Sequence, residues 1–161
     1  MSKEIFITGA TGFLGSNLVK KFLSYKYNIY ALIRKDSDKS RIIDLKDINY
    51  IEYQESCLEN FFKENKIDVL IHTACNYGRG NESNKEIIDT NLNLGLELIN
   101  LCEKFRVPLF VNTHTTLPRE LNIYSSSKHE FSDNLKKRKG LTKILNFVFD
   151  HMYGPYDDEN K

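Results

Sequence analysis

The 161-residue sequence has few cysteines and almost no net charge, and both shortages limit the kinds of protein it can be. The three cysteines, Cys57, Cys75 and Cys102, form no C-x-x-C pair, which argues against a disulfide framework or a zinc site and is typical of a reducing cytoplasm. The formal net charge is +1, with acids and bases interspersed, so bulk electrostatics give no reason to expect nucleic-acid or membrane binding. We therefore predict a cytoplasmic protein without a metal site.

The sequence also lacks long apolar runs, repeats, low-complexity segments and a cleavable signal. No apolar run approaches the length needed to span a bilayer. One basic run, residues 136–139, is interpreted as the end of a helix, where cations suit the helix dipole. With 40% hydrophobic residues, a chain of this length can bury a sizeable core. We expect one domain over residues 1–161.

Short apolar runs alternate with longer amphipathic stretches along the chain. The runs predict strands over 5–7, 29–33, 48–53, 69–71, 109–111 and 144–149, of which 48–53 alternates like an edge strand. Helical spacing predicts helices over 15–24, 58–65, 85–105 and 125–139. Such alternation implies right-handed crossovers, so the predicted fold class is α/β with a doubly wound parallel sheet.

A glycine-rich turn follows the first predicted strand and opens the first predicted helix. Its glycines, Gly9, Gly12 and Gly15, have the spacing G-x-x-G-x-x-G. In such a turn one glycine permits the bend, another lets backbone N–H groups approach a pyrophosphate, and the last allows close helix–strand packing. The anion then lies at the helix N-terminus. The alternative is a glycine turn without a ligand, but its place in the alternating pattern favours a dinucleotide site in a Rossmann-type fold.

The end of the second predicted strand bears on the choice between NAD and NADP. An acidic residue there would bind the ribose 2′-OH of NAD, whereas an arginine can meet the 2′-phosphate of NADP. Arg34 ends the strand, Lys35 follows and Asp36 lies just beyond. Because the arginine comes first, NADP(H) is favoured over NAD(H). The alternative is that Arg34 and Lys35 are solvated loop residues.

A tyrosine precedes a lysine by four residues at the start of the last predicted helix. Residues at this spacing, here Tyr124 and Lys128, share one face of a helix. The pKa of a tyrosine is ordinarily about 10, too high for a base at neutral pH, and a nearby ammonium together with an oxidised nicotinamide ring should lower it. On its own, the spacing fits equally well the polar start of a surface helix.

The sequence resembles the extended short-chain dehydrogenase/reductase (NAD-dependent epimerase/dehydratase) family in five ordered motifs: TGATGFLGSN, DVLIHTA, TNLNLGLELI, FVNTHT and YSSSK. The resemblance covers residues 5–158 and implies enzymes that act on nucleotide-sugars. HTACNYGR and HMYGPYDDENK look like the nucleotide-sugar 4-ketoreductases of the CDP-abequose synthase kind. Members of the family continue well beyond this point, so the resemblance also implies that a C-terminal substrate domain is missing.

The resemblance assigns roles to particular residues. Tyr124 and Lys128 match the family's proton-transfer pair, and Thr115, with Thr113 as a fallback, matches the hydroxyl that orients the substrate oxygen. The cofactor contacts that it implies are Gly9, Thr11, Gly12, Phe13, Leu14, Gly15, Arg34, His72, Thr73, Ala74, Asn91, Tyr124 and Lys128.

Other polar residues near these motifs leave alternatives open. His72 at a strand end is also compatible with a histidine satisfied by backbone hydrogen bonds. Arg79 is either a contact to a substrate phosphate or a surface arginine. Cys75 and Cys102 are expected to be small buried apolar residues.

The implied activity is NADP(H)-dependent reduction of a 4-keto nucleotide-sugar, with this chain as the cofactor-binding half. Dehydration is disfavoured, because Thr115 is followed by Thr116 and Leu117 rather than by the acidic residues of the dehydratases. The alternatives are an epimerase and a non-catalytic dinucleotide-binding remnant or sensor, so whether this chain is itself an enzyme stays open. The expected partners are a nucleotide-sugar and a second copy in a homodimer.

Overall fold

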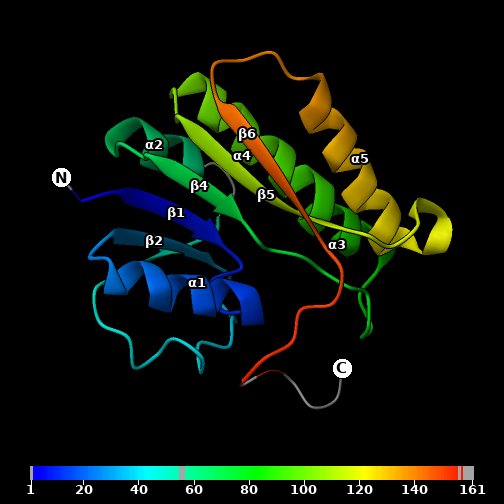
Figure 1. Cartoon of the computed structure of the whole chain (residues 1–161), viewed down its shortest axis with the longest axis horizontal. Helices are drawn as coiled ribbons and strands as arrows, with labels where there is room; N and C mark the ends of the chain where they lie inside the picture. The colour runs from blue at the N-terminus through cyan, green and yellow to red at the C-terminus, as the bar shows by residue number, and fades with distance from the viewer. Residues whose placement is uncertain (1, 55–56, 156, 158–161) are drawn as a thin grey trace.

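The protein is built around a parallel sheet of six strands in the order β3-β2-β1-β4-β5-β6 (Figure 1). A computed structural model describes residues 2–54, 57–155 and 157. The strands are β1 (Glu4–Thr8), β2 (Asn28–Ile33), β3 (Ile48–Glu52), β4 (Val69–His72), β5 (Leu109–Thr115) and β6 (Lys143–Phe149). The strand order reverses between β1 and β4, where α/β sheets place their ligands. The predicted doubly wound sheet is confirmed, and β3 lies at its edge as predicted.

Helices cover both faces of this sheet and enclose two cores. On one face lies α1 (Phe13–Ser24) (Figure 1), and its Val19 packs in one cluster with Ile5 and Ile7 of β1. On the other face, α2 (Cys57–Glu64), α4 (Leu94–Lys104) and α5 (Ile123–Lys137) cover a core that includes Phe6 and Phe110. Because side chains alternate across a strand, β1 supplies both cores.

The predicted helix over 85–105 is interrupted by a wider turn. It consists of α3 (Asn84–Ile88), a π-helical turn η1 (Asp89–Asn93) and α4. A capping box starts it: Ser83 Oγ accepts the N–H of Glu86, and the Glu86 carboxylate accepts the N–H of Ser83. Such turns often occur at functional sites, and this one holds Asn91.

The strand and the helix that carry the predicted catalytic residues, β5 and α5, have bounds different from those predicted. β5 continues past residue 111 to Thr115, because it stays paired with β6 as far as Phe149. A short 3-10 turn, η2 (Arg119–Leu121), follows, and α5 then begins at Ile123 because Asn122 caps it. The helix ends at Lys137, which confirms the interpretation of the basic run.

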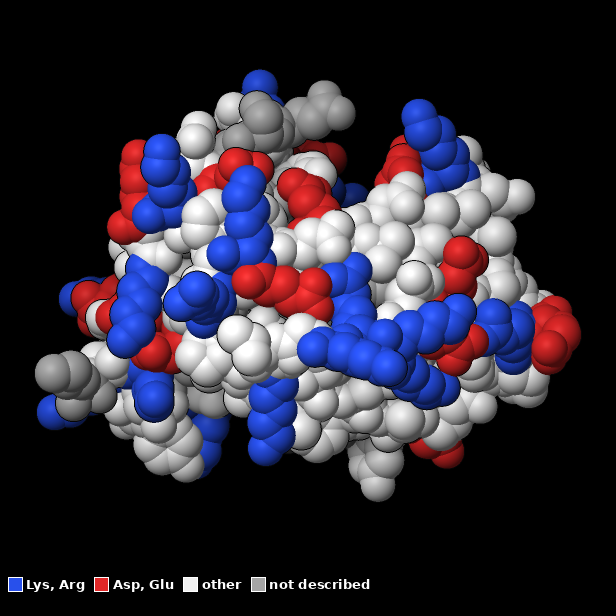
Figure 2. Space-filling model, turned by 90° about the horizontal axis from the view of Figure 1, so that it is seen from above, with Lys and Arg blue, Asp and Glu red and all other residues white. Residues whose placement is uncertain are grey.

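The surface mixes charges of both signs. On the face shown in Figure 2, acidic side chains lie among the basic ones. Within residues 2–54, 57–155 and 157, no helix has the length and apolar character to cross a bilayer. The same part of the chain has no cluster of three or more His, Cys, Asp or Glu side chains that could hold a metal ion.

Candidate active site

The glycine turn joins the carboxyl end of β1 to α1 through contacts that side chains would block. Gly9 has φ +67°, and a Cβ there would lie 2.6 Å from the backbone nitrogen of Ala74. A Cβ on Gly15 would lie 2.0 Å from the carbonyl oxygen of Gly9. Gly12 is the exposed N-cap of α1 and donates its N–H to Gly9 O at 3.0 Å. This cradle of bare backbone at a helix N-terminus fits a dinucleotide pyrophosphate.

Two arginines lie on the α1 and β2 side of this turn. Arg34 is the first residue after β2 and is exposed, with its backbone fixed by hydrogen bonds to Ser37 of 2.9 and 3.1 Å. The guanidinium of Arg41 lies 6.0 Å from the ring centre of Phe13, a half-buried residue predicted to line the cofactor. Thr11 and Leu14, from the same predicted set, are also half-buried. Sequence reasoning missed Arg41, because it lies eight residues beyond the strand end and only the folded loop brings it to α1.

The turn after β4 is held by hydrogen bonds to Thr8. The hydroxyl of Thr8 lies 2.8 Å from His72 Nδ1 and accepts the N–H of Ala74 at 3.2 Å. Thr73 donates its hydroxyl to the carbonyl of Thr8 at 2.7 Å. His72 is fully buried, and burial, with the nearby Lys128 ammonium, lowers its pKa to about 3. A neutral His72 therefore orients Thr8 and, through it, the turn that faces Gly9.

Asn91 holds the next part of the same loop. It is fully buried in the π-helical turn, where its amide accepts the N–H of Asn76 and donates to the carbonyl of Asn76, both at 2.8 Å. Both the oxygen and the nitrogen of the Asn91 amide are therefore hydrogen-bonded to the backbone of Asn76. The structure places Asn91 as a support for the loop after Ala74 rather than as an open cofactor contact.

Thr115, Tyr124 and Lys128 come together where β5 ends and α5 begins. The Thr115 hydroxyl lies beside the Tyr124 phenol, where it favours the phenolate and so opposes the rise in the pKa of Tyr124. All three residues are buried, with exposed fractions of 7%, 8% and 2% respectively. The fallback residue Thr113 donates its hydroxyl to the carbonyl of His72 at 3.2 Å. The geometry therefore favours Thr115 as the hydroxyl beside the tyrosine.

Burial dominates the electrostatics of this group. It raises the pKa of Tyr124 to about 12, assisted by Cys75 and opposed by the Thr115 hydrogen bond and the charge of Arg79. It also lowers the pKa of Lys128. The predicted lowering of the Tyr124 pKa is not seen in the chain alone, because that effect required a positive nicotinamide ring as well as the ammonium. A protonated phenol is the form that can donate a proton.

A second tyrosine, which sequence reasoning missed, covers the first. The ring of Tyr77 stacks on that of Tyr124 with centroids 4.8 Å apart and a tilt of 35°, and the Arg79 guanidinium lies 4.9 Å from the Tyr77 ring centre. Cys75 is half-buried and hydrogen-bonded to Tyr77, so it lies in the site rather than in a core. The signal was the position of NYGR directly after the turn at His72, Thr73 and Ala74.

The other two cysteines are Cys102 and Cys57. Cys102 is fully buried in the aromatic core, as predicted, and burial raises its pKa. The side chain of Cys57 lies outside the described part of the chain.

Comparison with solved structures first defines the class of fold. The Bordetella bronchiseptica enzyme WbmH, solved with NAD+, superposes with a TM-score of 0.86 at 18% identity, over 98% of this chain and 58% of that one. A UDP-glucose 4-epimerase from Thermotoga maritima, solved with UDP-glucose, gives a TM-score of 0.85 at 20% identity, over 96% and 58%. This likeness shows a Rossmann-type α/β fold.

The sequence then defines the family. Residues 5–161 match the NAD dependent epimerase/dehydratase family, and the chain belongs to it. CDP-abequose synthase of Salmonella typhimurium is 25% identical over 100% of this chain, and UDP-glucose 4-epimerase of Caenorhabditis elegans is 29% identical over 88%. The chain spans 57% and 47% of the lengths of these two relatives.

Proposed function

We propose that this chain forms the cofactor-binding half of an NADP(H)-dependent oxidoreductase that reduces a 4-keto nucleotide-sugar. The observation that supports this most directly is the buried group of Thr115 at the end of β5 and Tyr124 at the start of α5, with Lys128 one helical turn further along α5. This group of residues and the glycine turn both lie at the carboxyl ends of the parallel strands. The relatives named above support a nucleotide-sugar as substrate class.

In this proposal Tyr124 is the acid of the reduction. The bound dinucleotide supplies a hydride to the carbonyl carbon of the sugar. Tyr124 donates its proton to the carbonyl oxygen, which becomes the hydroxyl oxygen, and the phenolate then regains a proton from solvent. Thr115 donates a hydrogen bond to the same oxygen and stabilises its developing charge. Lys128 lowers the energy of the phenolate and holds the nicotinamide ribose.

The raised pKa of Tyr124 in the cofactor-free chain agrees with reduction, in which the tyrosine starts protonated. With a pKa of about 12 the phenol holds its proton at neutral pH, which suits an acid better than a base. An epimerase of the same family is the second candidate, supported by the Caenorhabditis elegans relative. It differs in consuming no NADPH overall.

The first prediction concerns Tyr124→Phe. The chain is mixed with NADPH and a CDP- or dTDP-linked 4-keto sugar, and nicotinamide absorbance and product are followed. Phenylalanine keeps the ring stack on Tyr77 but has no proton to give, so turnover should fall by about 100-fold or more while NADPH binding changes less than about threefold.

Three results separate the candidates. Product formation without net NADPH loss identifies the epimerase. Tyr124→Phe with every property unchanged favours the non-catalytic dinucleotide-binding protein. Failure of the unaltered chain to bind either dinucleotide contradicts the proposal as a whole.

A further inference from the structure

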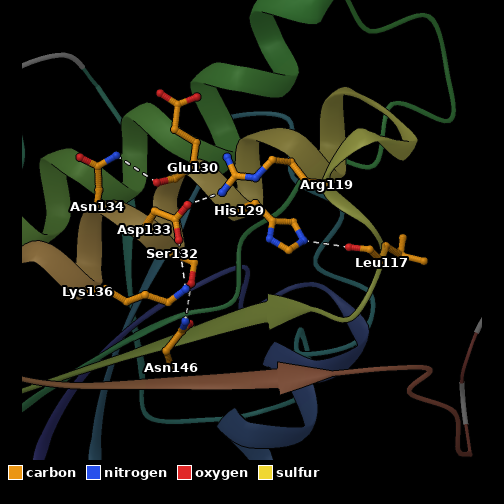
Figure 3. A network of polar contacts seen from close by, with 9 residues as sticks. All are labelled: Leu117, Arg119, His129, Glu130, Ser132, Asp133, Asn134, Lys136 and Asn146. Carbon is orange, nitrogen blue, oxygen red and sulfur yellow. Dashed lines mark hydrogen bonds and ion pairs between the residues drawn. The ribbon is translucent and has the colours of Figure 1, made fainter.

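The peptide of Leu117 links the predicted catalytic hydroxyl to α5. The N–H of Leu117 donates to Thr115 Oγ1 at 3.2 Å. The carbonyl of Leu117 lies 2.8 Å from His129 Nε2 (Figure 3), and it also accepts the hydroxyl of Ser125 at 3.1 Å. Leu117 is thus hydrogen-bonded to Thr115 through its amide N–H and to α5 through its carbonyl.

The direction of the histidine contact is fixed by its partner. A carbonyl oxygen can only accept, so Nε2 of His129 carries the hydrogen. The ring is held from a second side by His114 of β5, the neighbour of Thr115, with ring centroids 4.6 Å apart at 81°. His129 is therefore fixed between the end of β5 and the loop that follows it.

The same contacts determine what the Thr115 hydroxyl can do. A hydroxyl has one hydrogen and accepts through its lone pairs. Since Oγ1 of Thr115 accepts the N–H of Leu117, its own hydrogen stays available for donation, and Thr115 lowers the pKa of Tyr124 as such donation would.

We propose that His129 is a positioning residue for the reaction, which holds the Leu117 peptide so that its N–H orients the Thr115 hydroxyl toward Tyr124 and the substrate oxygen. This inference rests on the proposed function. The loop does not depend on His129 for its folding, because an ion pair between Arg119 and Asp133 also ties it to α5 (Figure 3).

Two amide variants that differ by one methylene test the role. In His129→Gln the amide nitrogen reaches about as far as Nε2, whereas in His129→Asn it stops about 1.5 Å short. Arg119→Met is the matched control, because it releases the same loop from α5 further from Thr115. The readouts are amide hydrogen exchange at Leu117, kcat and KM for the 4-keto sugar at saturating NADPH, and the urea midpoint as a check on folding.

We expect His129→Asn to speed exchange at Leu117 and to lower kcat by about tenfold with KM nearly unchanged, since the lost interaction acts in the transition state. In His129→Gln, most of the protection from exchange at Leu117 and most of kcat should be recovered. Arg119→Met should leave kcat within about twofold of the unaltered chain. The inference is overturned if Asn and Gln behave alike, or if His129→Asn leaves Leu117 exchange unchanged. If the unaltered chain binds neither dinucleotide, the proposed function fails, while the exchange comparison of Asn with Gln still decides whether His129 holds Leu117.

Discussion

Arg34 is the residue on which the proposed preference for NADP(H) depends. It is exposed at the end of β2, on the strand next to the one that carries the glycine turn. A 2′-phosphate at this edge would gain a charge-assisted hydrogen bond from its guanidinium, and a plain 2′-hydroxyl would not.

Arg34→Ala should therefore weaken NADPH binding by about tenfold while changing NADH binding less than about twofold. Fluorescence titration of each dinucleotide gives the ratio. Lys35→Ala, one residue further along the same loop, is the control and should shift the ratio less. A variant that loses affinity for both dinucleotides equally would show that Arg34 does not select between them.

Short motifs predicted single residues of the candidate site. The spacing predicted Tyr124 and Lys128, and the resemblance led from Phe110 to Thr115 at the strand end. Tyr77 and Thr8 were missed because their roles depend on contacts with residues far away in the sequence. Tyr77 matters through a stack with Tyr124, 47 residues away, and Thr8 through a bond to His72.

Among the elements, α1 depends most strictly on a glycine. The Cβ of an alanine at position 15 would lie 2.0 Å from the carbonyl oxygen of Gly9, and backbone cannot yield as a flexible side chain can. We expect Gly15→Ala to displace the start of α1, lowering NADPH affinity by about tenfold and the free energy of unfolding by about 1–3 kcal/mol.

Gly140→Ala is a suitable comparison for this change. Its Cβ would lie 2.6 Å from a carboxylate oxygen of Glu103, the far end of a side chain that can move. Dinucleotide titration and urea unfolding measure both variants. Equal behaviour of the two would argue against a tight turn between Gly9 and Gly15.

Element types followed from the sequence, but irregular turns did not. Periodicity predicted all six strands and the main helices, because burial on one or both faces leaves a pattern in the side chains. The π-helical turn leaves no such pattern. It places Asn91 against the backbone of Asn76, a contact between segments 15 residues apart that only the folded chain contains.

For the whole molecule, buried histidine makes stability depend on pH. In the folded state the pKa of His72 is lowered from 6.5 to about 3, chiefly by burial. Below pH 6.5 the unfolded chain therefore binds a proton that the folded chain does not. The stabilisation is present above that pH and is lost as the pH falls toward 3.

The free energy of unfolding should fall through this window by up to about 1.4 kcal/mol per pH unit from His72 alone. Urea unfolding at several pH values, compared with His72→Gln, measures the contribution as the difference in slope. His151→Gln, which removes an exposed histidine, should keep the slope of the unaltered protein. Identical slopes for all three would contradict the assignment.

The contact between Gly9 and Ala74 joins two loops through backbone atoms alone. A contact of this kind does not depend on the identity of neighbouring side chains, so long as position 9 has none. The side chains around the turn can therefore change while its backbone shape persists. If the turn holds a dinucleotide as proposed, the side chains of Thr11, Phe13 and Leu14 are the places to vary its affinity for protein engineering, and the backbone beneath them is best left untouched.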